Sequence, residues 1–149
     1  MKEILLGLSL SAFSTTSAAN GATEDITVSG LMVLATTEGQ INSAAYMQLE
    51  NDCRCEDHAL VAVYSPVAIA VELHTQVNTN GIMKMRRIDE IELTANSKVV
   101  LQPGGLHLML IGLKKVINNG DSVPLTLEFD DGSRMDVIAP ARDIVVSDS

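Results

Sequence analysis

The sequence predicts an all-β protein, built as a sandwich or barrel of short strands. Apolar and β-branched residues arrive in short runs, and clusters of turn-forming residues separate one run from the next. No stretch sustains a helical period long enough to replace this interpretation. At 149 residues, the chain is long enough for one domain with a sizeable core and too short for two.

The first half of the chain supplies five expected strands, each rich in β-branched or other apolar residues. Asn51-Asp52 ends the second strand, and Asn78-Thr79-Asn80-Gly81 separates the fourth from the fifth, because Asn, Asp and Gly accept the backbone conformations of tight turns. The five expected strands cover residues 26–33, 44–50, 59–64, 68–77 and 82–88.

The second half continues in the same way. Gln102-Pro103-Gly104-Gly105, Asn118-Asn119-Gly120-Asp121 and Asp130-Asp131-Gly132 are turn sequences for the same physical reason. The remaining expected strands cover residues 91–93, 99–101, 106–113, 123–129 and 134–139.

The first nineteen residues are expected to be an export signal. Lys2 is followed by an apolar run at 4–13, and Ser17-Ala18-Ala19 offers a small-residue cleavage site. The run is too short to span a bilayer. No cysteine comes directly after the cleavage site, so a lipid anchor is not indicated. The alternative is a disordered or core segment. We therefore expect a periplasmic domain at 20–149, with its core at about 25–142.

The composition excludes several classes of partner. The net charge is −9, and Lys2 and Glu3 cancel, so losing the signal leaves it unchanged. An acidic surface argues against nucleic acid and against insertion of the mature chain at anionic membranes. It suits a carrier of cations, although solubility explains it equally. Aromatic residues make up 3% and Trp is absent, so the chain lacks a stacking platform.

Four residues form a candidate metal site: His74, Met85, His107 and Met109. Imidazole and thioether are ligands for a soft, electron-rich metal, and the soft sulfur donors select Cu(I) over Zn, Mg or Ca. His107 and Met109 are two residues apart on an expected strand, so their side chains share a face. We therefore predict one Cu(I) site without a catalytic role. The sequence has no nucleophile elbow, phosphate-binding Gly-rich loop or H-E-x-x-H motif, which argues against an enzyme.

The turn at 78–81 limits how His74 and Met85 can meet. A four-residue loop pairs residues 77 and 82 and sets His74 directly opposite Met85. A two-residue turn at Asn80-Gly81 pairs Gln76 with Met85 and leaves His74 a diagonal neighbour on the same face. A three-residue loop would place the two side chains on opposite faces. Only the first two registers allow a shared ion.

The spacing of these four residues resembles that of the periplasmic copper(I) chaperone family, PCuAC. The resemblance covers about 25–142 and implies a cupredoxin-like Greek-key β-sandwich or barrel. It further implies delivery of Cu(I) to the dinuclear copper centre of cytochrome c oxidase or to another copper chaperone. The segment 31–43 lacks the aromatic and Pro-rich stretch of that family. Matching flanks are Ala44-Ala45-Tyr46-Met47, Ser65-Pro66-Val67-Ala68, Val71-Glu72-Leu73-His74, Pro103-Gly104-Gly105-Leu106-His107-Leu108-Met109-Leu110 and Gly120-Asp121-Ser122-Val123-Pro124-Leu125-Thr126-Leu127.

Cys53-Arg54-Cys55-Glu56-Asp57-His58 is a second feature and lies outside that family pattern. Two thiolates and an imidazole in six residues can bind Cu(I) or Zn, although the cysteine spacing is shorter than in most zinc sites. The alternatives are a redox role, a disulfide between the two cysteines, or idle thiols. A blue-copper electron carrier needs a Cys in the copper set, and these cysteines are far from the motif.

Residues around the motif also have two interpretations. Met83 shares the face of Met85 and is either a spare thioether or a packing residue. Basic side chains either dock an acidic acceptor or are solvated strand ends. For the whole chain, the alternative functions are copper sequestration with the same site, or an interaction β-sandwich in which Met and His only pack. The basic residues concerned are Lys84, Arg86, Arg87, Lys114 and Lys115.

Overall fold

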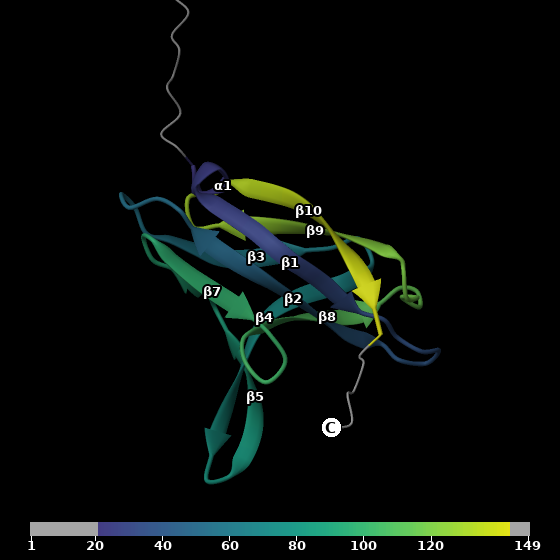
Figure 1. The fold of residues 1–149 in the computed structure, drawn as a ribbon. Helices are drawn as coiled ribbons and strands as arrows, with labels where there is room; N and C mark the ends of the chain where they lie inside the picture. The colour runs from purple at the N-terminus through teal and green to yellow at the C-terminus, as the bar shows by residue number, and fades with distance from the viewer. Residues whose placement is uncertain (1–20, 144–149) are drawn as a thin grey trace, which may run out of the picture.

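The computed structural model describes residues 21–143, and the expected signal at 1–19 lies outside them. The described residues form one short helix and ten strands (Figure 1). Their bounds are α1 Ala22–Asp25, β1 Ile26–Leu34, β2 Asn42–Asn51, β3 His58–Tyr64, β4 Ala68–Thr79, β5 Ile82–Ile88, β6 Ile91–Leu93, β7 Ser97–Leu101, β8 His107–Leu113, β9 Ser122–Phe129 and β10 Arg134–Arg142.

Seven of the strands close into a barrel. The order around it is β4, β8, β2, β1, β10, β9 and β3, and a pairing of Val63 with Val71 joins β3 back to β4. The strands are antiparallel to their neighbours except β1 and β10, which run parallel where Val33 lies beside Ala141. β5, β6 and β7 are attached outside this ring, to β4, β3 and β2. The predicted all-β class is confirmed.

The ten expected strands are present, and the differences lie at their ends. β10 runs past the expected end at residue 139 because Ala141 and Arg142 pair with β1. β7 starts before residue 99 because Ser97 pairs with Asn51 of β2. The turn of helix α1 was not expected, since four residues are too few to show a helical period. Within residues 21–143, no helix is long and apolar enough to cross a membrane.

Side chains that alternate along the strands fill the interior of the barrel. In β9, every second residue from Val123 to Phe129 is buried, and the residues between them are less so. Each large side chain buried in this way contributes roughly 1.5–3 kcal/mol to stability. On β4 and β8, Leu73, Leu108 and Leu110 point into the same core. Their neighbours in the sequence therefore lie on the opposite face of those strands.

Strands β4 and β5 form a hairpin that extends away from the barrel (Figure 1). Almost all of β5 is exposed. Asn80 and Gly81 form the turn with φ values of 53° and 82°, the left-handed conformations that a two-residue hairpin turn needs. Gln76 pairs with Met85. Of the two registers that the sequence allowed, the structure has the two-residue turn.

Candidate metal centre

His74 and His107 lie directly opposite each other on neighbouring strands. His74 belongs to β4, His107 is the first residue of β8, and the two are paired across these strands. Their ring centroids are 5.7 Å apart. Leu73 pairs with Leu108 at the next position and points into the core, so the two rings lie on the other face. The structure thus brings together two of the predicted ligands that are distant in the sequence.

Each imidazole has one nitrogen held by a hydrogen bond. The Nδ1 of His107 donates to the carbonyl oxygen of Gly105 at 3.0 Å, and the Nε2 of His74 donates to the carboxylate of Glu72 at 2.8 Å. Carbonyl and carboxylate oxygens only accept, so the ring protons lie on those two nitrogens. In the neutral rings, the lone pairs therefore lie on His74 Nδ1 and His107 Nε2, which is the tautomer that a metal-binding imidazole requires here.

Those two free nitrogens are buried, and neither has a hydrogen-bond partner within the described part of the chain. His107 is 3% exposed, and the side chain of His74 is 13% exposed. A buried polar atom without a partner costs about 1–3 kcal/mol, and native proteins contain few of them. A metal ion between β4 and β8 would satisfy both nitrogens at once.

The two predicted methionines lie on the same face as the histidines. Met109 follows His107 by two residues in β8 and is partly buried. Met85 lies in β5 opposite Gln76, so it is a diagonal neighbour of His74 across the hairpin. Met85 is 49% exposed. The four donor side chains therefore lie on three adjacent strands. His74 is on β4, His107 and Met109 are on β8, and Met85 is on β5, outside the barrel.

Two further residues contact the histidines, and the sequence analysis did not assign them a role. Glu72 lies two residues before His74, so strand alternation alone places it on the same face and could have identified it. The ring of Tyr46 in β2 is 6.5 Å from that of His107, and burial raises the pKa of the Tyr46 hydroxyl. Tyr46 is here because β2 lies next to β8. No local signal in the sequence reports that order of strands.

The exposed end of the site is basic. Arg87 is paired with His74 across the hairpin, and Lys84 and Arg86 are exposed on the same strand. Met83 shares the face of Met85 and is 54% exposed. The residues from 73 to 88 include no Asp or Glu, so the hairpin is positive on a chain whose net charge is −9.

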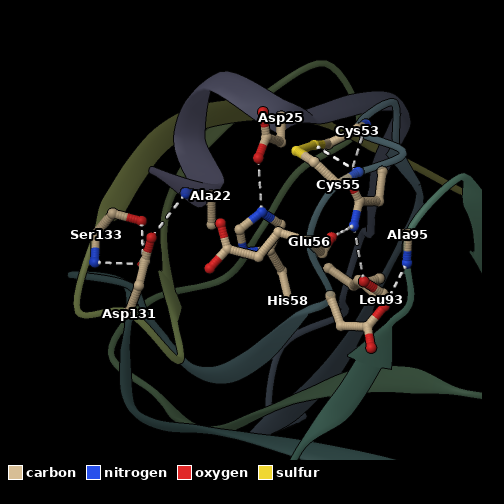
Figure 2. Close-up of polar contacts among 12 residues, drawn as sticks. Ala22, Asp25, Cys53, Cys55, Glu56, His58, Leu93, Ala95, Asp131 and Ser133 are labelled. Atoms are coloured by element: carbon tan, nitrogen blue, oxygen red, sulfur yellow. Dashed lines mark hydrogen bonds and ion pairs between the residues drawn. A yellow bond between two sulfur atoms is a disulfide. The ribbon is translucent and has the colours of Figure 1, made fainter. Parts of the chain in front are cut away.

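The second predicted cluster lies elsewhere. Cys53 and Cys55 form a disulfide, which was one of the alternatives that the sequence left open. His58 pairs with the Asp25 carboxylate at 2.8 Å. Figure 2 shows this group beside α1, and Figure 1 shows α1 at the top of the molecule and the β4–β5 hairpin at the bottom. These residues therefore do not contribute to the His74–His107 centre.

Comparison with known sequences places the chain in a family. A family profile described as "Putative lipoprotein LpqE-like" matches residues 26–141. "Putative lipoprotein Lxx21020" of Leifsonia xyli subsp. xyli is 36% identical over 85 residues, which are 56% of this chain and 51% of that protein. "Uncharacterized protein RP573" of Rickettsia prowazekii is 34% identical over 94 residues, which are 62% of this chain and 51% of that protein. The chain spans about half the length of these curated relatives.

Solved structures share the fold. The copper-bound PCuAC domain from PmoF2 has a TM-score of 0.69 at 24% identity, covering 80% of this chain and 94% of that domain. Apo-DR1885 from Deinococcus radiodurans has a TM-score of 0.63 at 30% identity, covering 81% and 80%. Its CuI form has a TM-score of 0.64 at 28% identity, covering 80% and 78%. The predicted cupredoxin-like fold is confirmed, and the match over residues 26–141 shows that the chain belongs to the LpqE-like family, with the fold of PCuAC domains.

Proposed function

We propose that this chain is an exported copper(I) metallochaperone that binds one Cu(I) ion through His74, Met85, His107 and Met109. The observation that carries the proposal is the pair of buried imidazole nitrogens, without partners in the described residues, on facing strands. Imidazole and thioether together suit Cu(I), whereas oxygen-rich donor sets suit harder cations. The CuI form of DR1885, at 28% identity, supports the same metal.

The exposure of the donors favours delivery over sequestration. His74, His107 and Met109 are buried or partly buried, and Met85 is 49% exposed on a hairpin outside the barrel. An exposed thioether can leave the ion first, so that an incoming ligand replaces it while three donors still hold the metal. A sequestering protein gains nothing from such an opening. The acceptor that we propose is the dinuclear copper centre of cytochrome c oxidase, or another copper chaperone.

The alternative of an interaction β-sandwich is less well supported. If His74 and His107 only packed, their two free nitrogens would stay buried and unsatisfied, at a cost that native proteins seldom accept. For location, we propose the periplasm. The expected signal at 1–19 supports this, as does membership of a family described as putative lipoproteins. The protein we propose is a carrier, not an enzyme.

The binding proposal is tested by titrating the chain with Cu(I) under anaerobic conditions, in competition with a chromogenic Cu(I) chelator. We expect one equivalent, and X-ray absorption should show two nitrogen and two sulfur donors. Replacing His107 and Met109 together by Ala should abolish chelator-resistant binding. Met85→Leu should weaken binding, whereas Met83→Leu, a matched exposed methionine on the same face, should leave it within about twofold. Oxygen-only ligation, or undiminished copper in the double variant, would refute the proposed site.

Delivery is tested separately. The Cu(I)-loaded chain is mixed with the copper-free soluble domain of an oxidase copper subunit, and the two proteins are separated before the copper in each is measured. Copper on the acceptor within minutes supports delivery. Copper that stays wholly on this chain, with the acceptor still able to take Cu(I) from the chelator, supports sequestration instead.

A further inference from the structure

The end of the barrel beside α1 holds a second group of metal-binding side chains, separate from the His74–His107 centre. Cys53 and Cys55 lie in the loop between β2 and β3, Asp25 is the last residue of α1, and His58 starts β3. In Figure 2 the Asp25 carboxylate lies above the His58 ring and beside the two sulfur atoms. Three segments of the chain therefore converge on one carboxylate.

The loop that carries the cysteines is held in place by a buried amide. Asn51 is 1% exposed. Its Nδ2 donates to the carbonyl oxygens of Glu56 and Leu93, both at 2.9 Å, and its Oδ1 accepts from the backbone N–H of Cys53 at 3.0 Å. The backbone N–H of Asn96 also donates to the carbonyl of Cys53 at 2.8 Å. The loop is thus organised before any ligand arrives, as a preformed site requires.

Asp25 is itself buried and oriented. Its Oδ2 accepts a hydrogen bond from His58 Nε2 at 2.8 Å, and the two side chains are 9% and 2% exposed. One ligand atom each from Asp25, Cys53 and Cys55 lies within 4.8 Å of the others. The same holds for Asp25, Glu56 and His58. The Asp25 carboxylate belongs to both sets, and it is buried together with His58, whereas Glu56 and Cys55 are exposed.

The chemistry of this group differs from that of the first centre. Two thiolates with a carboxylate are zinc ligands, and a fourth position is open to the exposed Glu56 or to water. Cu(I) would use the two sulfurs and leave the hard carboxylate oxygen unused. The backbone N–H of Cys55 donates to Cys53 Sγ at 3.1 Å, a contact that favours a thiolate there. His58 would act as a positioning residue that orients the carboxylate ligand.

We propose that Cys53, Cys55 and Asp25 bind one Zn²⁺ ion when the cysteines are reduced, and that the Cys53–Cys55 disulfide closes this site. A dithiol reductant gives two electrons and two protons to the disulfide, and its own two sulfurs become a disulfide. Zn²⁺ then displaces the two thiol protons as it binds. Cys55 is exposed and Cys53 is partly exposed, so both reagents can reach the sulfurs. None of these residues belongs to the proposed copper site, so either proposal can fail alone.

The test uses the full chain with His74 and His107 both replaced by Ala, which removes the first centre. The chain is prepared oxidised, or reduced with a phosphine that brings no thiol of its own. Each form is titrated with Co²⁺ and then with Zn²⁺. We expect thiolate-to-cobalt absorption in the near ultraviolet and one equivalent of Zn²⁺ in the reduced chain only. A reduced chain without that absorption, or an oxidised chain that binds equally well, would overturn the proposal.

Substitutions separate this site from a simple pair of thiols. Asp25→Asn should weaken Zn²⁺ binding by about tenfold or more, whereas Asp52→Asn, an exposed carboxylate beside Cys53, should change it less than about twofold. Equal affinity of Asp25→Asn and the parent would contradict the ligand set. If Asp25→Asn does not fold, His58→Gln tests the same carboxylate through the residue that orients it. Weaker Zn²⁺ binding by the reduced His58→Gln chain supports the proposal, and affinity equal to that of the parent contradicts it.

Discussion

The two histidines of the candidate copper centre are held by partners of different kinds. His107 donates to the backbone carbonyl of Gly105, in a loop where Gln102 donates to the carbonyl of Leu106 at 2.9 Å. No side-chain substitution removes that acceptor. His74 instead donates to a carboxylate two residues away. Glu72 therefore sets both the tautomer of His74 and a negative charge next to the expected cation.

Glu72→Ala should lower Cu(I) affinity by about tenfold or more, because the His74 ring loses the partner that leaves Nδ1 free. Glu72→Gln should lose less, since an amide oxygen still accepts the hydrogen bond. Affinities are compared by competition with a Cu(I) chelator. Glu92→Ala, on an exposed position of β6, is the control for loss of a surface carboxylate. Unchanged affinity in Glu72→Ala would show that the ring is positioned by other contacts.

At the scale of elements, the β4–β5 hairpin and the β9–β10 turn offer matched glycines. Gly81 has φ +82° and Gly132 has φ +83°, and a side chain at either position would meet nothing within 4 Å. A substitution therefore acts through backbone conformation alone. For an L-residue, the left-handed conformation costs about 1–2 kcal/mol. Only the first of the two turns carries a proposed ligand strand.

Gly81→Val should weaken Cu(I) binding toward the level of Met85→Leu, because the hairpin frays and Met85 leaves the site. The free energy of unfolding of the metal-free chain should change little, since β5 lies outside the barrel and opens locally. Gly132→Val should do the reverse, with stability lower by about 1–2 kcal/mol and unchanged affinity. Urea unfolding and chelator competition on both variants check this. Equal effects of the two substitutions on affinity would contradict it.

The β9–β10 turn also secures α1 through Asp131. Ala22 N–H donates to its carboxylate at 2.7 Å, and Ser133 N–H donates at 2.9 Å. Burial works to raise the pKa of Asp131, but these hydrogen bonds, the Ser133 hydroxyl and the charge of His58 bring the pKa below its ordinary value of 3.8. A lowered pKa means that the carboxylate stabilises the fold above the pKa of the unfolded chain. That contribution is lost as the pH falls through the pKa of the folded chain.

Asp131→Asn should therefore be less stable than the parent at pH 6 by about 1 kcal/mol or less, because the group is exposed. The difference should shrink as the pH falls below about 4. Urea unfolding of both chains at pH 6 and pH 3 measures it. Asp130→Asn, the exposed neighbour, should stay within about 0.5 kcal/mol of the parent at both values. A stability difference between parent and Asp131→Asn that grows as the pH falls would contradict the predicted direction of the pH dependence.

At the scale of the whole molecule, the two candidate sites use different segments, one beside α1 and the other where β4 and β8 meet at the base of the β4–β5 hairpin (Figure 1). Replacing Cys53 and Cys55 by Ser should leave one Cu(I) bound with unchanged affinity. The disulfide closes a very short loop, so its removal should cost no more than about 1.5 kcal/mol. Copper stoichiometry and urea unfolding check both statements. Loss of copper with the fold intact would mean that the copper site has been misassigned.

Whether a feature could be predicted from the sequence depends on how far apart in the chain its interacting residues are. The strands were predicted because alternation and turns are local signals, and β9 shows both. The shared face of His107 and Met109 followed from their spacing, and the turn left two registers for Met85. The closing pairs of the barrel, such as Val63 with Val71, link distant segments and carry no local signal. For the same reason, Asp25 was not expected beside Cys53.

The placement of Met85 on the hairpin has a kinetic consequence. The seven barrel strands keep all their pairings when β5 moves, because among the strands within residues 21–143 β5 pairs only with β4. Breaking the contact between Met85 and a bound ion is therefore a local event, with its own rate, and it does not wait for the barrel to unfold. Substitutions that stabilise the core should lengthen the lifetime of the folded chain without slowing the transfer of its ion. In this fold, the barrel strands set the lifetime of the folded chain, and β5 sets the rate at which the ion is exchanged.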